Sequence, residues 1–235
     1  MGKRVHWLKG LTFINACLSL TDNIKMKIFY PASKQYLYFT QSTPQPINQL
    51  TSQLINQPTF NIMSVLQLFK QIKTFVFDVD GVLATEILVI LQCGDMARNM
   101  NSKDGYALQL AVKKGYGVVI ISGGTSEPVR QRFERLGVRD VFLGVYDKKE
   151  ILLEYARKKQ LHLHEMLYMG DDIPDYVVMN LVGLPCCPAD AVQEIKQISK
   201  YISPVDGGRG CGRDVIEKVL KLNGHWDMDT SVTSK

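Results

Sequence analysis

The chain has 235 residues, of which 46% are hydrophobic, a composition typical of a globular protein with one ordinary domain and some additional segments. No apolar run approaches the roughly 18 residues that a membrane span needs, so the sequence predicts no membrane partner. The net charge is +5, but residues 1–62 hold six basic residues against the single acid Asp22, and the remaining residues are balanced. The basic excess therefore does not indicate nucleic-acid binding by the folded part.

The first 62 residues differ in composition from the rest. Segment 39–61 is rich in Gln, Asn, Thr, Ser and Pro, has almost no charge and lacks both helical and strand periodicity, which predicts disorder. Met63 begins a short amphipathic stretch that leads directly into the first buried strand, and we hypothesise that Met63 is the natural start. The expected organisation is a disordered or non-native extension over 1–62, a folded domain over 63–224 and a flexible tail over 225–235.

The cysteines indicate a reducing compartment. There are five of them, an odd number, at irregular spacing and without a Cys-x-x-Cys pair. This pattern favours free or buried thiols in the cytoplasm over disulfides or a zinc site.

After Met63, short apolar runs alternate with helical patterns. A hairpin is expected over 86–100, around a Cys-Gly-Asp turn, and a helix is expected to begin with Ser102 as its N-cap. Buried strands are predicted over 74–79, 117–122, 140–145, 165–170, 183–187 and 200–203, and helices over 102–114, 126–137, 147–159, 174–180, 189–199 and 212–222.

This alternation predicts an α/β fold with a doubly wound, mostly parallel sheet, a hairpin inserted after the first strand and no large cap domain. In such sheets, ligands bind at the carboxyl ends of the strands. Four successive predicted strands end in polar residues, namely Asp78 and Asp80, then Ser122, then Lys148, then Asp171, Asp172 and Asp175.

These motifs, in this order, resemble those of the haloacid dehalogenase (HAD) superfamily of phosphohydrolases. The stretches "FDVDGVL", "MNSKDGYALQLAVKKGY", "GDDIPD", "VGLPCCPADA" and "GGRGCGRDVIEKVL" are similar to its small, capless branch of 3-deoxy-D-manno-octulosonate 8-phosphate (KDO 8-phosphate) phosphatases. The resemblance implies a homotetramer in which the hairpin forms intersubunit strands, and a role in lipopolysaccharide precursor synthesis. Two departures stand out: "DGVLATE" where the family usually has "DGVLTDG", and Gly124 where some relatives have Arg or Glu.

The resemblance also implies roles for the motif residues. Asp78 would be the nucleophile and Asp80 the general acid and base. A Mg²⁺ ion would be bound by side-chain oxygens of Asp78 and Asp171 and by the backbone carbonyl of Asp80. Ser122, Gly123 and Lys148 would bind the phosphoryl group. Asp172 and Asp175 would contact the metal ligands, and Asp172 could also share in binding the metal. The substrate carboxylate would bind to cations chosen from Arg98, Lys103, Arg209 and Arg213.

Other interpretations stay open at this point. The substrate could be another acidic sugar phosphate, such as a nonulosonate 9-phosphate. The acidic pair, the Ser and the Lys also occur in phospho-accepting signalling modules, which keep their phosphoryl group, although Asp80 two residues after the acceptor favours turnover. A lone Asp-x-Asp is more often a turn or cap, and Arg209 alone could simply be a solvated loop residue.

Overall fold

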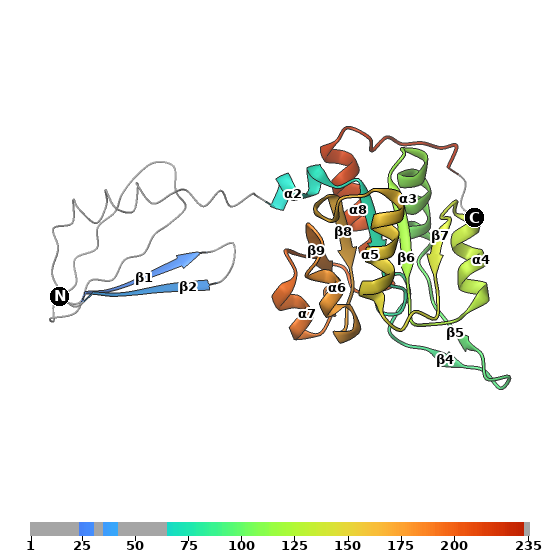
Figure 1. Ribbon diagram of the computed structural model, residues 1–235, viewed down its shortest axis with the longest axis horizontal. Coiled ribbons are helices and arrows are strands. Elements are labelled where there is room, and N and C mark those ends of the chain that lie inside the picture. The colour runs from blue at the N-terminus through green and yellow to red at the C-terminus, as the bar shows by residue number, and fades with distance from the viewer. Residues whose placement is uncertain (1–23, 31–34, 42–64, 233–235) are drawn as a thin grey trace. The chain divides into compact units, whose positions relative to one another are not determined.

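The structure is a computed structural model that describes residues 24–30, 35–41 and 65–232 (Figure 1). The chain divides into two units, residues 1–62 and residues 63–235. In the first unit, β1 (Ile24–Tyr30) pairs with β2 (Gln35–Gln41) in an antiparallel hairpin within the segment that the sequence predicted to be disordered. The predictions for the rest of 1–62, including the start at Met63, fall outside the described residues.

The second unit is built on a six-stranded parallel sheet with the order β10-β9-β8-β3-β6-β7, which confirms the predicted α/β class. The strands are β3 (Thr74–Phe77), β6 (Gly117–Ile121), β7 (Asp140–Phe142), β8 (Met166–Met169), β9 (Leu184–Cys187) and β10 (Tyr201–Ile202). Central β3 is buried along its whole length, as its uninterrupted apolar sequence predicts. Within 65–232, no large cap domain interrupts this arrangement.

Helices cover both faces of the sheet (Figure 1). Because side chains alternate along a strand, Phe75 and Phe77 enter one apolar cluster and Val76 enters the other. The first cluster receives α2 (Val65–Gln71), α3 (Ser102–Lys113), α4 (Glu127–Arg135) and α8 (Cys211–Leu222); the second receives α5 (Lys148–Lys159), α6 (Tyr176–Met179) and α7 (Gln193–Ile198). None of the described helices combines the length and apolar character that a membrane span requires.

The helix boundaries lie within two residues of the predicted ones, except that α7 begins at Gln193 and not near Ala189. One predicted N-cap is also wrong. The N-cap of α3 is Asn101, not Ser102, because the Asn101 side chain accepts a hydrogen bond from the backbone N–H of Lys103. Ser126 and Asp147 occupy the N-cap positions of α4 and α5 as expected. Short 3₁₀ turns over Leu163–Glu165 and Ile173–Asp175 precede β8 and α6.

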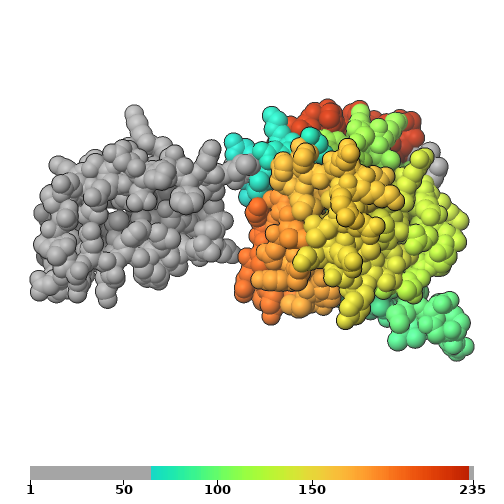
Figure 2. Space-filling view, viewed as in Figure 1, coloured from blue at the N-terminus to red at the C-terminus, as the bar shows by residue number. Residues whose placement is uncertain are grey.

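The inserted hairpin projects from the body of the unit (Figures 1 and 2). It consists of β4 (Val89–Ile90) and β5 (Met96–Ala97), which pair antiparallel. At its base, Ala84 bridges Met100, and the backbone N–H of Thr85 donates to the carbonyl of Asn99. Ala84 and Thr85, two of the three residues that depart from the family sequence, therefore begin the paired part of the hairpin.

The described part of the C-terminal tail lies against α3 and α8. Lys113 and Lys114 form ion pairs with Asp229 and Asp227, with nitrogen–oxygen distances of 2.5 and 2.7 Å. The Trp226 ring meets that of Tyr106 edge-on at 6.1 Å between centroids. The prediction of a flexible tail did not include these contacts. The mobility of the tail in solution stays a prediction.

Candidate active site

Neighbouring strands of the sheet bring the predicted motif residues to one edge. Asp78 directly follows β3, Ser122 follows β6, and Asp171 lies two residues after β8. Lys148 begins α5, in the connection that leaves β7. Because these four strands are adjacent and parallel in the order β8-β3-β6-β7, their carboxyl ends converge.

A buried ion-pair network forms the centre of this edge. The Lys148 Nζ lies 2.9 Å from Asp78 Oδ2 and 2.8 Å from Asp175 Oδ1. All three residues are nearly withdrawn from solvent, with exposed fractions of 7% for Lys148, 8% for Asp78 and 1% for Asp175. The ammonium group thus neutralises part of the charge of two carboxylates that would otherwise be costly to bury.

Asp171 lies against this network and has an oxygen that no group in the described part of the chain satisfies. Its Oδ1 is buried and has no hydrogen-bond partner among the described residues. Gly81, in a left-handed conformation with φ +81°, makes room for it, since a Cβ there would lie 2.0 Å from Asp171 Oδ2. Each of Asp78, Asp171 and Asp175 offers an oxygen within 4.8 Å of the others. An all-oxygen donor set with an unsatisfied buried carboxylate fits a hard divalent cation such as Mg²⁺.

The same crowding shifts the pKa values of the carboxyl groups. Burial, reinforced by the charge of Asp175, raises the pKa of Asp78 to about 7, although Lys148 opposes the shift. Burial and the charges of Asp78 and Asp175 raise the pKa of Asp171 to about 8. Burial lowers the pKa of Lys148, but the two carboxylates outweigh it, so the net shift is upward. Additional positive charge would therefore favour the ionised forms of Asp78 and Asp171 at neutral pH.

Asp80 points to a different partner, Arg98 of the inserted hairpin. The guanidinium binds the carboxylate in a bidentate manner, with Nε 2.6 Å from Oδ1 and Nη2 3.0 Å from Oδ2. The hydrogen bond to Asp80, opposed by burial, raises the pKa of Arg98 further. A Cβ on Gly124 would lie 3.0 Å from Arg98 Nη2, so the missing side chain of Gly124 leaves the space that Arg98 uses.

Ser122 and the glycines after it form a turn beside these groups. Ser122 is 3% exposed, and its Oγ accepts a hydrogen bond from the backbone N–H of Gly124 at 3.1 Å. The predicted phosphate-binding residue Gly123 is exposed. A Cβ on Gly124 would lie 3.5 Å from Ser122 Oγ and 3.6 Å from Asp80 Oδ2, which places hydroxyl and carboxylate around one point.

The structure separates the two predicted supporting carboxylates. Asp175 is buried and holds Lys148, whereas Asp172 is exposed and accepts a hydrogen bond from the backbone N–H of Ile173 at the start of a 3₁₀ turn. The predicted metal set counted Asp80 through its backbone carbonyl, while the three clustered carboxylates are those of Asp78, Asp171 and Asp175.

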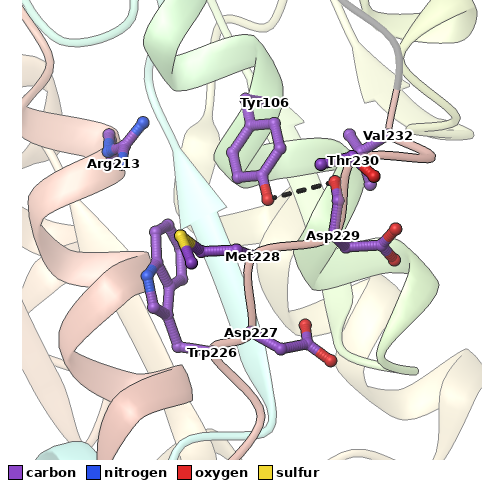
Figure 3. A pocket seen from close by; sticks show the side chains of 8 residues that line it. All are labelled: Tyr106, Arg213, Trp226, Asp227, Met228, Asp229, Thr230 and Val232. Carbon is purple, nitrogen blue, oxygen red and sulfur yellow. Dashed lines mark hydrogen bonds between the residues drawn. The ribbon is translucent and has the colours of Figure 1, made fainter.

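The remaining predicted cations lie at different places. Lys103 is exposed in the first turn of α3, and Arg209 is exposed in the loop before α8. The Arg213 guanidinium lies over the Trp226 and Tyr106 rings, 5.2 and 5.8 Å from their centroids, and Nε lies 3.2 Å from a Glu217 oxygen. Arg213 lines a pocket of about 270 Å³ between α3, α8 and the C-terminal segment (Figure 3).

Sequence reasoning missed Tyr168 in β8. It is fully buried, and its hydroxyl lies 2.7 Å from Asp175 Oδ1. The available signal was a phenol within an otherwise apolar buried strand, since a buried tyrosine hydroxyl requires a polar partner. That partner could not be located from the sequence, because it lies seven residues away beyond a turn.

The fold and the arrangement of these groups define a phosphohydrolase of the HAD superfamily. No family model matches the chain. The KDO 8-phosphate phosphatase of Escherichia coli strain K12 is 30% identical over 158 residues, which cover 67% of this chain and 84% of that protein. This chain therefore belongs to the KDO 8-phosphate phosphatase family.

Solved structures agree with this assignment. A KDO 8-phosphate phosphatase from Moraxella catarrhalis, in complex with magnesium, phosphate and KDO, superposes with a TM-score of 0.66 at 30% identity, covering 69% of this chain and 93% of that one. A putative HAD hydrolase of subfamily III A from Legionella pneumophila gives 0.67 at 28% identity, covering 74% and 93%.

Proposed function

We propose that the protein hydrolyses KDO 8-phosphate to KDO and phosphate, in a Mg²⁺-dependent reaction that serves lipopolysaccharide precursor synthesis. The observation that carries the proposal is the placement of Asp78, which follows the central strand and contacts the buried ammonium of Lys148 at 2.9 Å. The named relatives support the choice of substrate.

The metal would be held by side-chain oxygens of Asp78 and Asp171 and by the backbone carbonyl of Asp80. The unsatisfied Oδ1 of Asp171 supports this assignment, as does the magnesium in the Moraxella catarrhalis protein. Asp175 is a weaker ligand candidate because its oxygens are already engaged by Lys148, Tyr168 and the backbone N–H of Asp171. A bound Mg²⁺ supplies the positive charge that lets two anions approach each other.

The side chains then have separate tasks. Asp78 attacks phosphorus and becomes an aspartyl-phosphate, while the bond to the sugar oxygen breaks. Asp80 protonates that oxygen as it leaves and later takes a proton from the water that cleaves the aspartyl-phosphate. Lys148, Ser122 and the backbone N–H of Gly123 hold the phosphoryl oxygens, on which negative charge must be stabilised.

Arg98 is the best-placed candidate for the substrate carboxylate. It binds Asp80 directly beside the space left by Gly124, and its guanidinium suits a bidentate contact with a carboxylate. Binding of an acidic sugar would draw Arg98 from Asp80 to the substrate. Lys103, Arg209 and Arg213 are second choices, and Arg213 is already engaged by aromatic rings and Glu217.

The exposed hairpin supports the proposed homotetramer. Ile87, Val89, Ile90 and Met96 are between 48% and 75% exposed on a projecting segment, which is unfavourable for an isolated copy. Light scattering after size exclusion should give four copies for the wild type and fewer for Ile90→Asp. A wild-type monomer would contradict this part of the proposal.

The cysteines support a cytoplasmic location. Within the described residues, Cys93, Cys186, Cys187 and Cys211 are free thiols, as expected for a reducing compartment. Fractionation of the native cell, with detection of the protein by antibody, tests the location. Recovery from an oxidising compartment would refute it.

Phosphate release from a panel of sugar phosphates, with Mg²⁺ and with EDTA, tests the substrate and the metal together. We expect KDO 8-phosphate to give the highest kcat/KM and EDTA to abolish turnover. Preference for a nonulosonate 9-phosphate would instead favour the alternative substrate. A phosphoryl group that persists on Asp78 without release would favour a signalling module.

Replacement of the nucleophile tests the mechanism. Asp78→Asn keeps the shape of the side chain and the pair between Lys148 and Asp175, so the fold should survive. We expect kcat to fall at least about 1,000-fold, because an amide cannot act as the nucleophile. Steady-state kinetics on KDO 8-phosphate, with circular dichroism as the folding control, measures this. Near wild-type turnover would overturn the mechanism.

A further inference from the structure

Tyr168 is a buried polar residue that the proposed mechanism does not use. It lies in β8, opposite Val76 of β3, and faces the apolar cluster formed with α5 and α6. The same buried cluster contains Leu152 and Met179, and the exposed fraction of Tyr168 is 0%. A phenol hydroxyl in such a layer is costly unless it is hydrogen-bonded, and here it donates to Asp175 Oδ1 at 2.7 Å.

Asp175 is held from three directions. Its Oδ1 accepts from both Tyr168 and the Lys148 ammonium, while Oδ2 accepts from the backbone N–H of Asp171 at 3.3 Å. Gly170 allows the carboxylate to fold back over the end of β8, because a Cβ there would lie 2.4 Å from the Asp175 Cγ. The orientation of Asp175 is therefore fixed by its surroundings.

The shared oxygen has a consequence for Lys148. An Asp175 Oδ1 that accepts two donors attracts the ammonium less strongly than an oxygen that serves Lys148 alone. Lys148 can then remain in contact with Asp78 at 2.9 Å and respond to negative charge on a phosphoryl group. Without the phenol hydroxyl, Lys148 would be drawn closer to Asp175 and away from the reacting atoms.

We propose that Tyr168 is a positioning residue that acts through Asp175 to hold the Lys148 ammonium where it stabilises the phosphoryl transition state. The proposal rests on the phosphatase function proposed above. It concerns the step of phosphoryl transfer, so it does not depend on which sugar phosphate is the substrate.

The test compares Tyr168→Phe with a matched control, Tyr155→Phe. Tyr155 is 6% exposed, and its hydroxyl donates to Asp140 Oδ2 at 2.8 Å at the amino end of the sheet. Each variant loses one Tyr–Asp hydrogen bond, but only Tyr168 adjoins Lys148. With Mg²⁺ and p-nitrophenyl phosphate as the probe, we expect Tyr168→Phe to lower kcat about tenfold and change KM by less than about twofold. Tyr155→Phe should leave both constants near the wild-type values.

Inhibition by orthovanadate separates positioning from loss of folded protein. Vanadate mimics the geometry of the transition state, so its inhibition constant should rise by about the same factor as kcat falls. An unfolded fraction lowers kcat without changing that constant. A kcat equal to that of the wild type, or a lowered kcat with unchanged vanadate inhibition, would overturn the proposal.

A second criterion is whether the effect of Tyr168→Phe depends on Lys148. In a Lys148→Met background, Tyr168→Phe should cause no further loss of the residual activity, because the group through which it acts is gone. An additive loss would overturn the proposal. If Tyr168→Phe does not fold, site-specific 3-fluorotyrosine at position 168 keeps the hydroxyl and changes its acidity. A changed kcat there, and none for the same replacement at 155, supports the proposal; no change at 168 refutes it.

These outcomes are distinct from failure of the proposed function. Absence of KDO 8-phosphate turnover, with p-nitrophenyl phosphate turnover retained, would reject the substrate and leave the comparison of the tyrosine variants intact. Equal kinetics of wild type and Tyr168→Phe would reject the inference and leave the function intact.

Discussion

Asp171 and Asp104 share a rare property but belong to different regions of the molecule. Each has one buried carboxylate oxygen without a hydrogen-bond partner among the described residues. Burial is the main cause of a raised pKa in both, to about 8 for Asp171 and to about 6 for Asp104. Asp171 adjoins the carboxylates of Asp78 and Asp175, whereas Asp104 lies in the first turn of α3.

The surroundings of each carboxylate determine whether its unsatisfied oxygen indicates a metal site. Asp104 Oδ1 accepts a hydrogen bond at 2.6 Å from the backbone N–H of Arg213, in the first turn of α8. A carboxylate at a helix N-terminus satisfies a free N–H group and interacts favourably with the helix dipole. At Asp171, neighbouring carboxylates add to the negative charge, and a cation would relieve it. An unsatisfied oxygen therefore indicates a metal site only where further oxygen donors converge.

Replacement of Asp171 and replacement of Asp104 should differ most in their effects on activity. Asp171→Asn keeps the size of the side chain but removes a charged metal ligand, so we expect kcat/KM to fall at least about 1,000-fold. Asp104→Asn can still accept the hydrogen bond from Arg213, so its kcat/KM should stay within about threefold of the wild type. Steady-state phosphate release at saturating Mg²⁺ measures both. A large loss in Asp104→Asn with an intact fold would break the comparison, since it would place Asp104 in the catalytic machinery.

The sequence was sufficient to predict where the residues around Asp171 lie in the fold. Asp78, Ser122, Lys148 and Asp171 follow separate buried strands, and parallel strands must place their carboxyl ends at one edge. Local pattern and topology together were sufficient to predict the α/β class and the placement of these residues at one edge of the sheet. Their catalytic and metal-binding roles stay predictions.

Several side-chain contacts in both regions could not be predicted from the sequence. Asp104 meets Arg213 across 109 residues, and Arg98 meets Asp80 across 18, so neither pairing follows from local spacing. The hydrogen bond from Tyr168 to Asp175 depends on a chain reversal that Gly170 permits. Side-chain partners of this kind require the packed structure.

The free energy of unfolding should depend on pH differently in the wild type and in Asp104→Asn. The folded-state pKa of about 6 exceeds the value of 3.8 for an unperturbed aspartate, so the folded protein binds more protons than the unfolded chain between these values. The stabilisation is present below pH 4 and is lost as pH rises through 6. Asparagine resembles the protonated acid, so Asp104→Asn should match the wild type at about pH 3 and exceed its free energy of unfolding by roughly 3 kcal/mol at pH 7.5.

Urea unfolding at a series of pH values, with EDTA present in both samples, measures this difference. The pH dependence of the metal-site carboxylates is common to both proteins and cancels in the subtraction. Parallel stability curves for the two proteins would show that burial does not raise the pKa of Asp104.

The smallest effect expected is the stabilisation by Mg²⁺ itself. At a metal concentration ten times the dissociation constant, binding should stabilise the wild type by about 1.4 kcal/mol, and Asp104→Asn by the same amount. Asp171→Asn should show almost none. Thermal unfolding with Mg²⁺ and with EDTA measures the three shifts.

The effect of Mg²⁺ should also grow with pH. Without metal, Asp78 and Asp171 have folded-state pKa values of about 7 and about 8, above those of the unfolded chain, so their contribution to stability falls as pH rises towards 8. Metal binding must release the protons that these groups still hold at pH 6, which weakens it there. The thermal shift should thus be larger at pH 8 than at pH 6 in the wild type and in Asp104→Asn. An equal shift in Asp171→Asn would mean that the metal binds elsewhere, and the unsatisfied oxygen of Asp171 would then be no more informative than that of Asp104.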